Sequence, residues 1–258
     1  MPETAAGAHP APPPLVRHRL LGLPVDAIDM DAAVAHIAAA IRERRPLRAV
    51  VTNANKSWLA TRDARLRAAL EAADLVVPEW ATSWAAGVVG LKGVAHVGGI
   101  RLMQRLLAEA PARGWSVYLL GARPEVVETL AARLRREQPA LRLVGWHHGY
   151  LDEEAEAHVR RELADLRPDL LFAGMGSPRQ ELWLQALPRD AGPLVTLGVG
   201  GSFDVLSGHK RDTPTWMRGR GLEWLFRLSQ DPRNLWRRYL VTNPWFVARV
   251  LAERVRRA

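Results

Sequence analysis

The segment DLLFAGMGSPRQELW, residues 169–183, contains the change from strand to helix on which the fold assignment depends. Its first half, DLLFAG, is a short apolar run bounded by glycine, which is typical of a strand buried on both faces. The two glycines that follow turn the chain into a helix-like pattern that begins RQELW. A polar group therefore stands at the end of a buried strand, which in parallel sheets is the edge where ligands bind. It comprises Arg179, Gln180 and Glu181, which follow Pro178.

The same order of strand, turn and helix recurs on both sides of this segment. Further strands are expected at residues 47–55, 74–79, 115–122, 141–149 and 194–201. The helices expected around them span residues 56–73, 100–114, 124–139, 152–168 and 179–188, and a helical region ends the chain. Such repetition predicts an α/β fold with a Rossmann-like, mainly parallel sheet and helices on both faces.

Length and composition limit the domain organisation. The chain has 258 residues, enough for one α/β domain with an appendage, and it has no cysteine for disulfide, thiolate or thiol chemistry. Residues 1–14 are rich in proline and alanine, lack a signal-peptide pattern, and are expected to be disordered. We assign residues 15–208 to the α/β domain and residues 209–258 to a basic helical appendage. The apolar stretch 80–100 is too rich in glycine, and too interrupted by charge, for a membrane span.

The positive charge is concentrated in that appendage. The net charge is +9, and twelve Lys or Arg residues but only four Asp or Glu residues follow Ser207 and Gly208. Four of the ten tryptophans lie there as well. Basic residues interleaved with aromatic ones suit an anionic membrane surface or a nucleic acid. A solvated basic helix face above buried tryptophans remains the third interpretation.

Several strand ends carry glycine-rich turns followed by a helix. Backbone N–H groups at such turns bind phosphate, so a nucleotide or a nucleotide sugar is the first ligand to consider. The dinucleotide pattern G-x-G-x-x-G fails at Arg179 and again at Phe203, and no Walker A sequence is present. The sequence therefore favours a nucleotide ligand without a dinucleotide or P-loop fingerprint.

Long motifs between Val50 and Tyr239 carry a family resemblance. They include NANKSWLATRD, AADLVVPEW, HVGGIRLMQRLL, PDLLFAGMGSPRQELWL and LGVGGSFDVLSGHKRDTPTWMRGRGLEWLFRL. These motifs resemble the WecG/TagA/CpsF family of bacterial glycosyltransferases. The resemblance implies transfer of an N-acetylhexosamine or related hexose from a UDP-sugar to a polyprenyl-diphosphate-linked acceptor, with inversion and without a metal or other cofactor. It also implies surface polysaccharide synthesis by a peripheral protein on the cytoplasmic face of an anionic membrane, with no nucleic-acid partner, and it leaves a homo-oligomer open.

The resemblance also assigns candidate catalytic residues. Where the family normally has Pro-Asp-Gly, this sequence has Pro78-Glu79-Trp80. Glu79 is therefore the candidate base for the acceptor hydroxyl, with a solvent-facing loop carboxylate as the alternative. Asn53 and Gln180 match the family's asparagine and glutamine and complete the expected catalytic set.

Two larger sets are expected to bind the substrates. For the donor they are Thr52, Gly121, Gly174, Gly176, Gln180, Gly200 and Asp204. For the acceptor and its diphosphate they are His96, Arg211, Arg218, Arg220, Arg227, Arg237 and Arg238. His96 stands where the family has an arginine, and Arg101 stands where it has an aspartate. For Glu181 a helix-capping role is expected, and for Trp183 a packing role.

The C-terminal helix has an expected apolar face. Phe246, Val247, Val250, Leu251 and Val255 share one side of a helical projection. We expect this face to dock on a membrane. Two other functions stay open: a catalytically altered relative that binds nucleotide or lipid without turnover, and a nucleic-acid-binding protein with a basic tail.

Overall fold

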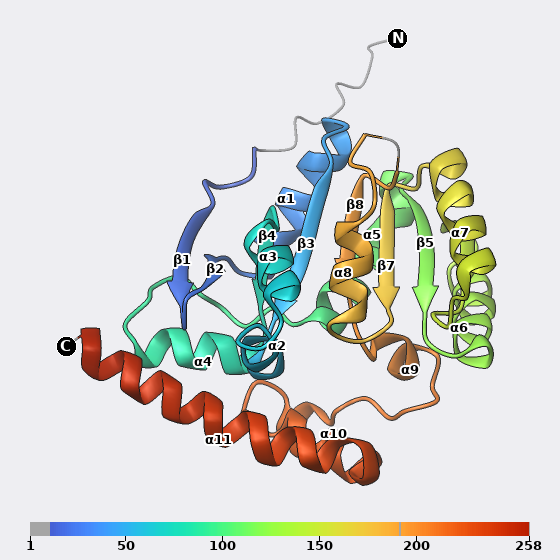
Figure 1. Ribbon diagram of the computed structural model, residues 1–258. Coiled ribbons are helices and arrows are strands. Elements are labelled where there is room, and N and C mark those ends of the chain that lie inside the picture. Colours follow the sequence, from blue (N-terminus) through green and yellow to red (C-terminus); the bar gives the residue numbers. More distant parts are fainter. Residues whose placement is uncertain (1–10, 191, 258) are drawn as a thin grey trace.

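The computed structural model describes residues 11–190 and 192–257 and contains a central parallel sheet between two layers of helices (Figure 1). The sheet has six strands in the order β4-β3-β8-β7-β5-β6, and every pairing is parallel. The strands are β3 (Leu47–Thr52), β4 (Leu75–Pro78), β5 (Ser116–Gly121), β6 (Arg142–His147), β7 (Leu170–Gly174) and β8 (Val195–Gly198). The α/β prediction is confirmed.

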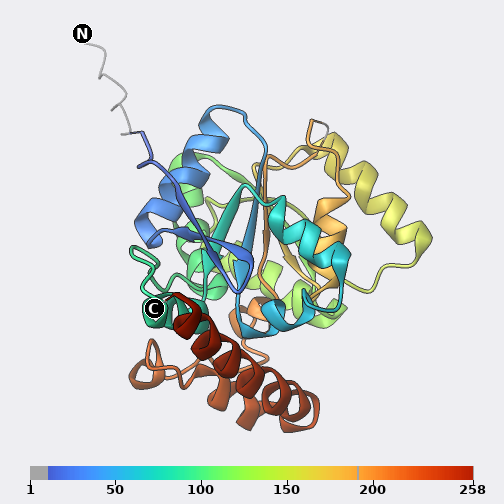
Figure 2. The ribbon, with the colours of Figure 1, turned by 60° about the vertical axis from the view of Figure 1, so that its left-hand side comes forward.

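Helices cover both faces of this sheet (Figure 2). On one face lie α1 (Met30–Arg42), α5 (Gly99–Arg113) and α6 (Pro124–Glu137). On the other lie α3 (Ala64–Glu71), α7 (Glu153–Leu166) and α8 (Arg179–Gln185). The short helices α2 (Ala54–Leu59), α4 (Trp80–Val88) and α9 (Ser202–Leu206) follow strand ends β3, β4 and β8.

The alternation of side chains along β5 shows why the strand sequences are apolar throughout. Val117 and Leu119 pack into the core under α1, α5 and α6. Tyr118 and Leu120 pack into the core under α7 and α8. A strand covered on both faces has no polar side, so it appears in the sequence as a continuous apolar run.

Three elements differ from the sequence prediction or were not anticipated. A short antiparallel hairpin, β1 (Val16–Leu20) and β2 (Leu23–Ala27), precedes α1. The single helix expected at 56–73 is two helices, because Asp63 caps α3 by accepting hydrogen bonds from the backbone N–H groups at positions 65 and 66. The stretch 80–100 contains the helix α4 and then an irregular loop.

The expected disordered tail lies mainly on residues 1–10, which are outside the described residues. Residues 11–15 form neither helix nor strand. No helix within the described ranges combines the length and the apolar character needed to cross a membrane.

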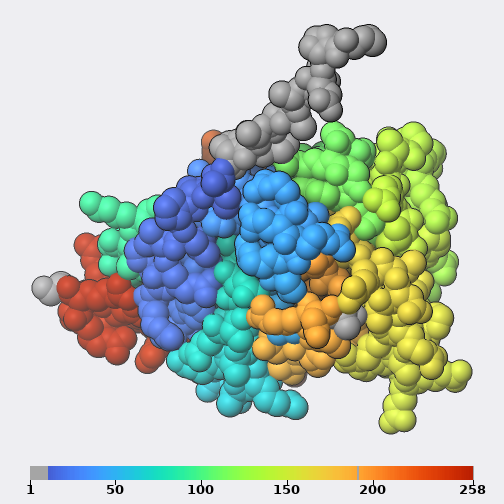
Figure 3. Space-filling model, turned by 90° about the horizontal axis from the view of Figure 1, so that it is seen from above, coloured from blue at the N-terminus to red at the C-terminus, as the bar shows by residue number. Residues whose placement is uncertain are grey.

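The appendage, residues 209–257, passes beneath the carboxyl ends of the strands (Figure 1). It contains the 3-10 helix η1 (Thr215–Met217), α10 (Glu223–Gln230) and the long helix α11 (Pro232–Arg257). The end of α11 is fixed to the hairpin, because Glu253 Oε2 accepts a hydrogen bond from the Leu21 backbone N–H at 2.9 Å. The view from above shows this end of α11 against the hairpin (Figure 3).

The predicted apolar face of α11 is divided between core and surface. Phe246 and Val250 are buried with residues of the hairpin and α4. Val247, Leu251 and Val255 are exposed. The expectation that all five residues present one docking face is therefore wrong for the two buried ones, because they anchor the appendage to the α/β domain.

Candidate active site

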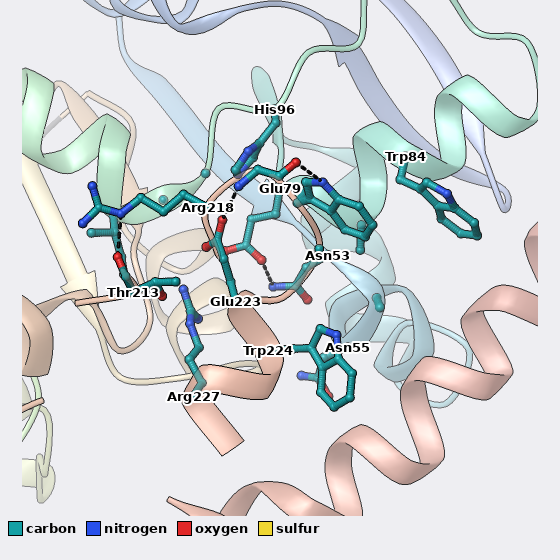
Figure 4. Close-up of a pocket in the computed structure, with 18 of the residues that line it drawn as sticks. Asn53, Asn55, Glu79, Trp84, His96, Thr213, Arg218, Glu223, Trp224 and Arg227 are labelled. Atoms are coloured by element: carbon teal, nitrogen blue, oxygen red, sulfur yellow. Dashed lines mark hydrogen bonds between the residues drawn. The ribbon is translucent and has the colours of Figure 1, made fainter. Parts of the chain in front are cut away.

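A cavity of about 920 Å³ lies between the carboxyl ends of β3 and β4 and the appendage (Figure 4). One wall comes from the residues that open α2 and α4. A second wall comes from residues 96–101, which include the first turn of α5. The appendage closes the remaining side with residues between Asp212 and Val247. The cavity is thus at the edge of the sheet where ligands bind in open α/β folds.

Asn53 and Glu79 meet at the inner end of this cavity. The Asn53 side chain caps α2, because its Oδ1 accepts a hydrogen bond from the Lys56 backbone N–H at 3.0 Å. Its Nδ2 donates to Glu79 Oε2 at 2.9 Å. The Glu79 backbone N–H donates to the Thr52 carbonyl at 3.0 Å, which fixes the start of α4. Asn53 therefore orients a carboxylate that lines the cavity and can accept a proton.

Cationic side chains line the wall opposite the strand ends. Arg101 donates two hydrogen bonds to the Asp212 carboxylate, at 2.9 and 2.8 Å. Arg218 donates to the same carboxylate at 3.1 Å and to the Thr213 carbonyl at 2.6 Å. One carboxylate thus holds two guanidinium groups, which suit the paired oxygens of a phosphate. The other basic lining residues are His96, Arg227 and Arg238.

Aromatic side chains line the rest of the cavity. Trp80 and Trp84 are stacked, with ring centroids 6.3 Å apart and planes 12° apart. The ring centroids of Trp224 and Tyr239 are 5.6 Å apart, and the ring planes are tilted by 59°. Burial raises the pKa of Tyr239 above its usual value. A cavity with arginines on one side and aromatic rings on the other fits a ligand that is part anion and part apolar.

Gln180 lies outside this cavity. Its side chain is 1% exposed, and its Oε1 accepts hydrogen bonds from the backbone N–H groups of Gly176 at 3.2 Å and Gly200 at 3.1 Å. Its Nε2 donates to Glu181 Oε1 at 2.7 Å. Gln180 thereby fixes the two glycine turns that follow β7 and β8, which is a structural task that the sequence analysis did not foresee.

Glu181 forms a buried ion pair instead of a helix cap. Its Oε1 lies 2.7 Å from Lys56 Nζ, and both side chains are almost fully buried. Lys56 Nζ also donates to the Val51 carbonyl at 2.7 Å. The capping prediction for Glu181 is wrong, because this pair connects α8 with the start of α2. Trp183 packs in the apolar cluster under α7 and α8, as predicted.

The other predicted donor residues also lie outside the cavity lining. They are Thr52, Gly121, Gly174, Gly176, Gly200 and Asp204. Gly121 has a structural reason to be glycine, since a Cβ there would lie 2.5 Å from the backbone of Gly174. Donor binding by these residues stays a prediction. It requires that the bound donor extend from the cavity along the edge of the sheet.

The predicted acceptor residues divide into two groups. His96, Arg218, Arg227 and Arg238 line the cavity, whereas Arg211, Arg220 and Arg237 do not. The sequence analysis missed several lining residues, and they are Asn55, Trp84, Asp212, Thr213, Glu223, Trp224 and Tyr239. Asp212, Thr213, Glu223 and Trp224 lie in the motif RDTPTWMRGRGLEW, and Asn55 lies in the motif NANKSWLATRD. Across residues 11–190 and 192–257, no group of three or more His, Asp or Glu side chains is arranged to hold a metal ion.

Comparison with known proteins identifies the family of this chain. The sequence profile of the glycosyl transferase WecG/TagA/CpsF family matches residues 18–258. A relative from Bacillus spizizenii strain W23, named N-acetylglucosaminyldiphosphoundecaprenol N-acetyl-beta-D-mannosaminyltransferase, is 30% identical over 203 residues, which are 78% of this chain and 77% of the relative. A relative of the same name from Staphylococcus aureus strain MW2 is 37% identical over 145 residues, and this match spans 56% of each chain, just over half the relative's length. The chain therefore belongs to the WecG/TagA/CpsF family of glycosyl transferases.

Proposed function

We propose that the protein is an inverting glycosyltransferase of bacterial surface polysaccharide synthesis. It moves N-acetylmannosamine or a related hexose from a UDP-sugar to a polyprenyl-diphosphate-linked acceptor. The observation that supports this best is the Glu79 carboxylate, held by Asn53 in a cavity with guanidinium groups and aromatic rings. The names of the relatives, which specify a diphosphoundecaprenol-linked N-acetylglucosamine acceptor, support the same substrate class.

Glu79 acts as the base in this proposal. The acceptor hydroxyl oxygen attacks the anomeric carbon while the bond from that carbon to the UDP oxygen breaks. The hydroxyl proton passes to the Glu79 carboxylate, and UDP leaves with the bonding electron pair. Because attack and departure take place on opposite sides of the anomeric carbon, the configuration inverts. The hydrogen bond from Asn53 holds the carboxylate in the orientation that proton transfer needs.

Arginine side chains supply the positive charge for the diphosphates, and no metal or other cofactor takes part in the proposed transfer. Arg218, Arg227 and Arg238 line the cavity together. Guanidinium groups offer paired donors to phosphate oxygens and remain charged at any physiological pH. Their placement on the appendage supports a closing role, because the same segment that covers the cavity brings the charge.

The appendage also supports a peripheral position on the cytoplasmic face of an anionic membrane. Trp216 is 61%, Trp236 46% and Leu240 66% exposed, and an arginine lies within two positions of each of them in the sequence. Exposed apolar side chains next to arginines favour binding to anionic lipid surfaces. Such a surface next to the cavity would bring the protein to a lipid-linked acceptor. A homo-oligomer through the same apolar residues is the competing use, and mass determination with and without lipid separates the two.

A thermal-shift titration tests the nucleotide part of the proposal. A ligand that binds only the folded state raises the apparent stability. We expect UDP to raise the melting temperature, and ADP, NAD and short oligonucleotides to leave it unchanged. A salt-sensitive shift with oligonucleotide and none with UDP would contradict the proposal and favour a nucleic-acid-binding protein. A shift with UDP but no sugar transfer to any lipid-linked acceptor would favour the catalytically altered relative.

A further inference from the structure

Trp80 joins the appendage to the strand end that carries Glu79. It directly follows Glu79 and is the first residue of α4. Its indole Nε1 donates a hydrogen bond to the Gly219 carbonyl at 2.9 Å. The ring also lies against Gly221, where an added Cβ would come within 2.4 Å of the indole carbons. Trp80 is therefore in close contact with the loop that precedes α10.

That loop is fastened at two places on opposite sides of the cavity. On one side Asp212 binds Arg101 of α5. On the other side Trp80 of α4 holds Gly219 and Gly221. The following helix α10 contributes no buried residue, so its own packing does little to hold the loop in place. The two contacts therefore act together with the buried side chains of Thr213 and Met217 in placing the loop.

Arg218 lies between the two fastening points and lines the cavity. Its guanidinium group is held by Asp212 and by the Thr213 carbonyl, and the residue after it is bonded to Trp80. Trp84 stacks on Trp80 and restricts the orientation of its ring. The contacts of Trp80 therefore fix the backbone from which Arg218 extends.

We propose that Trp80 is a positioning residue that holds the loop 212–221 across the cavity and so presents Arg218 to the anionic part of the acceptor. The family resemblance implies a glycine at this position, so the contact is a feature of this chain and not of the motif. The kinetic part of this inference rests on the proposed function. The structural part, that Trp80 holds the loop, is independent of any activity.

Hydrogen exchange measured on the full-length protein tests the structural part. The backbone N–H groups of Arg218 and Arg220 are hydrogen-bonded within the loop. In Trp80→Phe, which keeps a ring but loses the indole N–H, these amides are expected to exchange about fivefold faster, the effect of one lost hydrogen bond. In Trp80→Gly the exchange rate of these amides is expected to rise more than about tenfold, because the ring contact is lost as well. Trp58→Phe, on α2 and outside the cavity, is the matched control and should leave both amides unchanged.

A double-mutant cycle with Gly221 isolates the contact. In the parent, Gly221→Ala places a Cβ on the indole ring and also carries a backbone cost, because φ is +75° there. In the Trp80→Gly background only the backbone cost remains. Gly221→Ala should therefore accelerate exchange less in that background than in the parent. Additive effects of the two substitutions, or unchanged exchange in Trp80→Gly, would overturn the proposal.

Steady-state kinetics tests the positioning role. Trp80→Phe is expected to raise the KM for a polyprenyl-diphosphate-sugar acceptor about fivefold. The pH profile of kcat should keep its shape, since the contact between Asn53 and Glu79 is untouched. If the parent transfers sugar and Trp80→Gly has the parent's acceptor KM, Trp80 has no positioning role. If the parent transfers no sugar, the proposed function fails, and the exchange result still decides whether Trp80 holds the loop.

Discussion

The side-chain amide of Asn53 donates to the Glu79 carboxylate at 2.9 Å while its oxygen caps α2. One residue at the end of β3 therefore controls both the start of a helix and the orientation of the candidate base on the neighbouring strand end. Although they are 26 positions apart in the sequence, the two residues are therefore directly coupled by a hydrogen bond.

Substituting Asn53 by aspartate should change the pH dependence of turnover. Aspartate keeps the helix cap but places a second carboxylate beside Glu79. Two adjacent carboxylates share a proton, so the acid limb of the pH profile of kcat should move to higher pH. Asn53→Ser, which caps without charge and loses the same donor to Glu79, is the control and should move that limb less than Asn53→Asp does. An unmoved limb in Asn53→Asp would show that these carboxyl groups do not interact during turnover.

Removal of the buried Lys56 charge should destabilise the fold strongly. Lys56→Met leaves Glu181 buried without its partner, and such a change costs about 3–5 kcal/mol. Urea unfolding followed by circular dichroism measures the loss. The double variant Lys56→Met with Glu181→Met removes both charges and should recover most of the stability. A single variant as stable as the parent would mean that the ion pair contributes nothing.

Tyr118 should make the folded state less stable in alkali. Burial, together with the hydrogen bond to and the charge of Glu162, raises the pKa of Tyr118 well above its usual value. Above about pH 10 the unfolded chain loses this proton and the folded chain keeps it, so the free energy of unfolding falls by up to about 1.4 kcal/mol per pH unit. Tyr118→Phe should lack this part of the decline. Parallel stability curves for the two proteins between about pH 10 and 11.5 would contradict the assignment.

The anchoring of α11 should depend on its buried side chains. Phe246 is 3% exposed, and Phe246→Ala should cost about 3–5 kcal/mol of unfolding free energy. Val255 is 76% exposed on the same helix, and Val255→Ala should change stability by less than about 0.5 kcal/mol. Chemical denaturation of both variants measures the contrast. Equal effects at the two positions would mean that α11 is not held by this contact.

The parallel sheet could be predicted because its strands are apolar on both faces and are separated by helical patterns. The stretch 169–183 proved to be β7 followed by the start of α8. The hairpin at residues 16–27 escaped prediction because its buried polar residue, Asp26, is satisfied by Arg17 and by the backbone N–H of Val76. The contact with Val76, 50 positions away, leaves no local signal in the sequence.

The candidate site, too, could be predicted only in part from the sequence. Glu79 and Asn53 follow strand ends, which are identifiable in the sequence, and they line the cavity together. Asp212 was missed because its partner Arg101 is 111 positions away. Gln180 follows a strand end too, but its side chain turns inward to bind backbone N–H groups. A position at the sheet edge can be predicted from sequence, whereas the direction of a side chain depends on packing.

A transfer assay on the purified protein tests the central claim most directly. The protein is incubated with UDP-N-acetylmannosamine and polyprenyl-diphosphate-linked N-acetylglucosamine in anionic vesicles, and UDP release and lipid-linked product are measured. The account predicts a lipid-linked disaccharide with inverted anomeric configuration, and about 10²- to 10⁴-fold less of it per unit time with Glu79→Gln. Product formation by Glu79→Gln at the parent's rate, or a product with retained configuration, would contradict it.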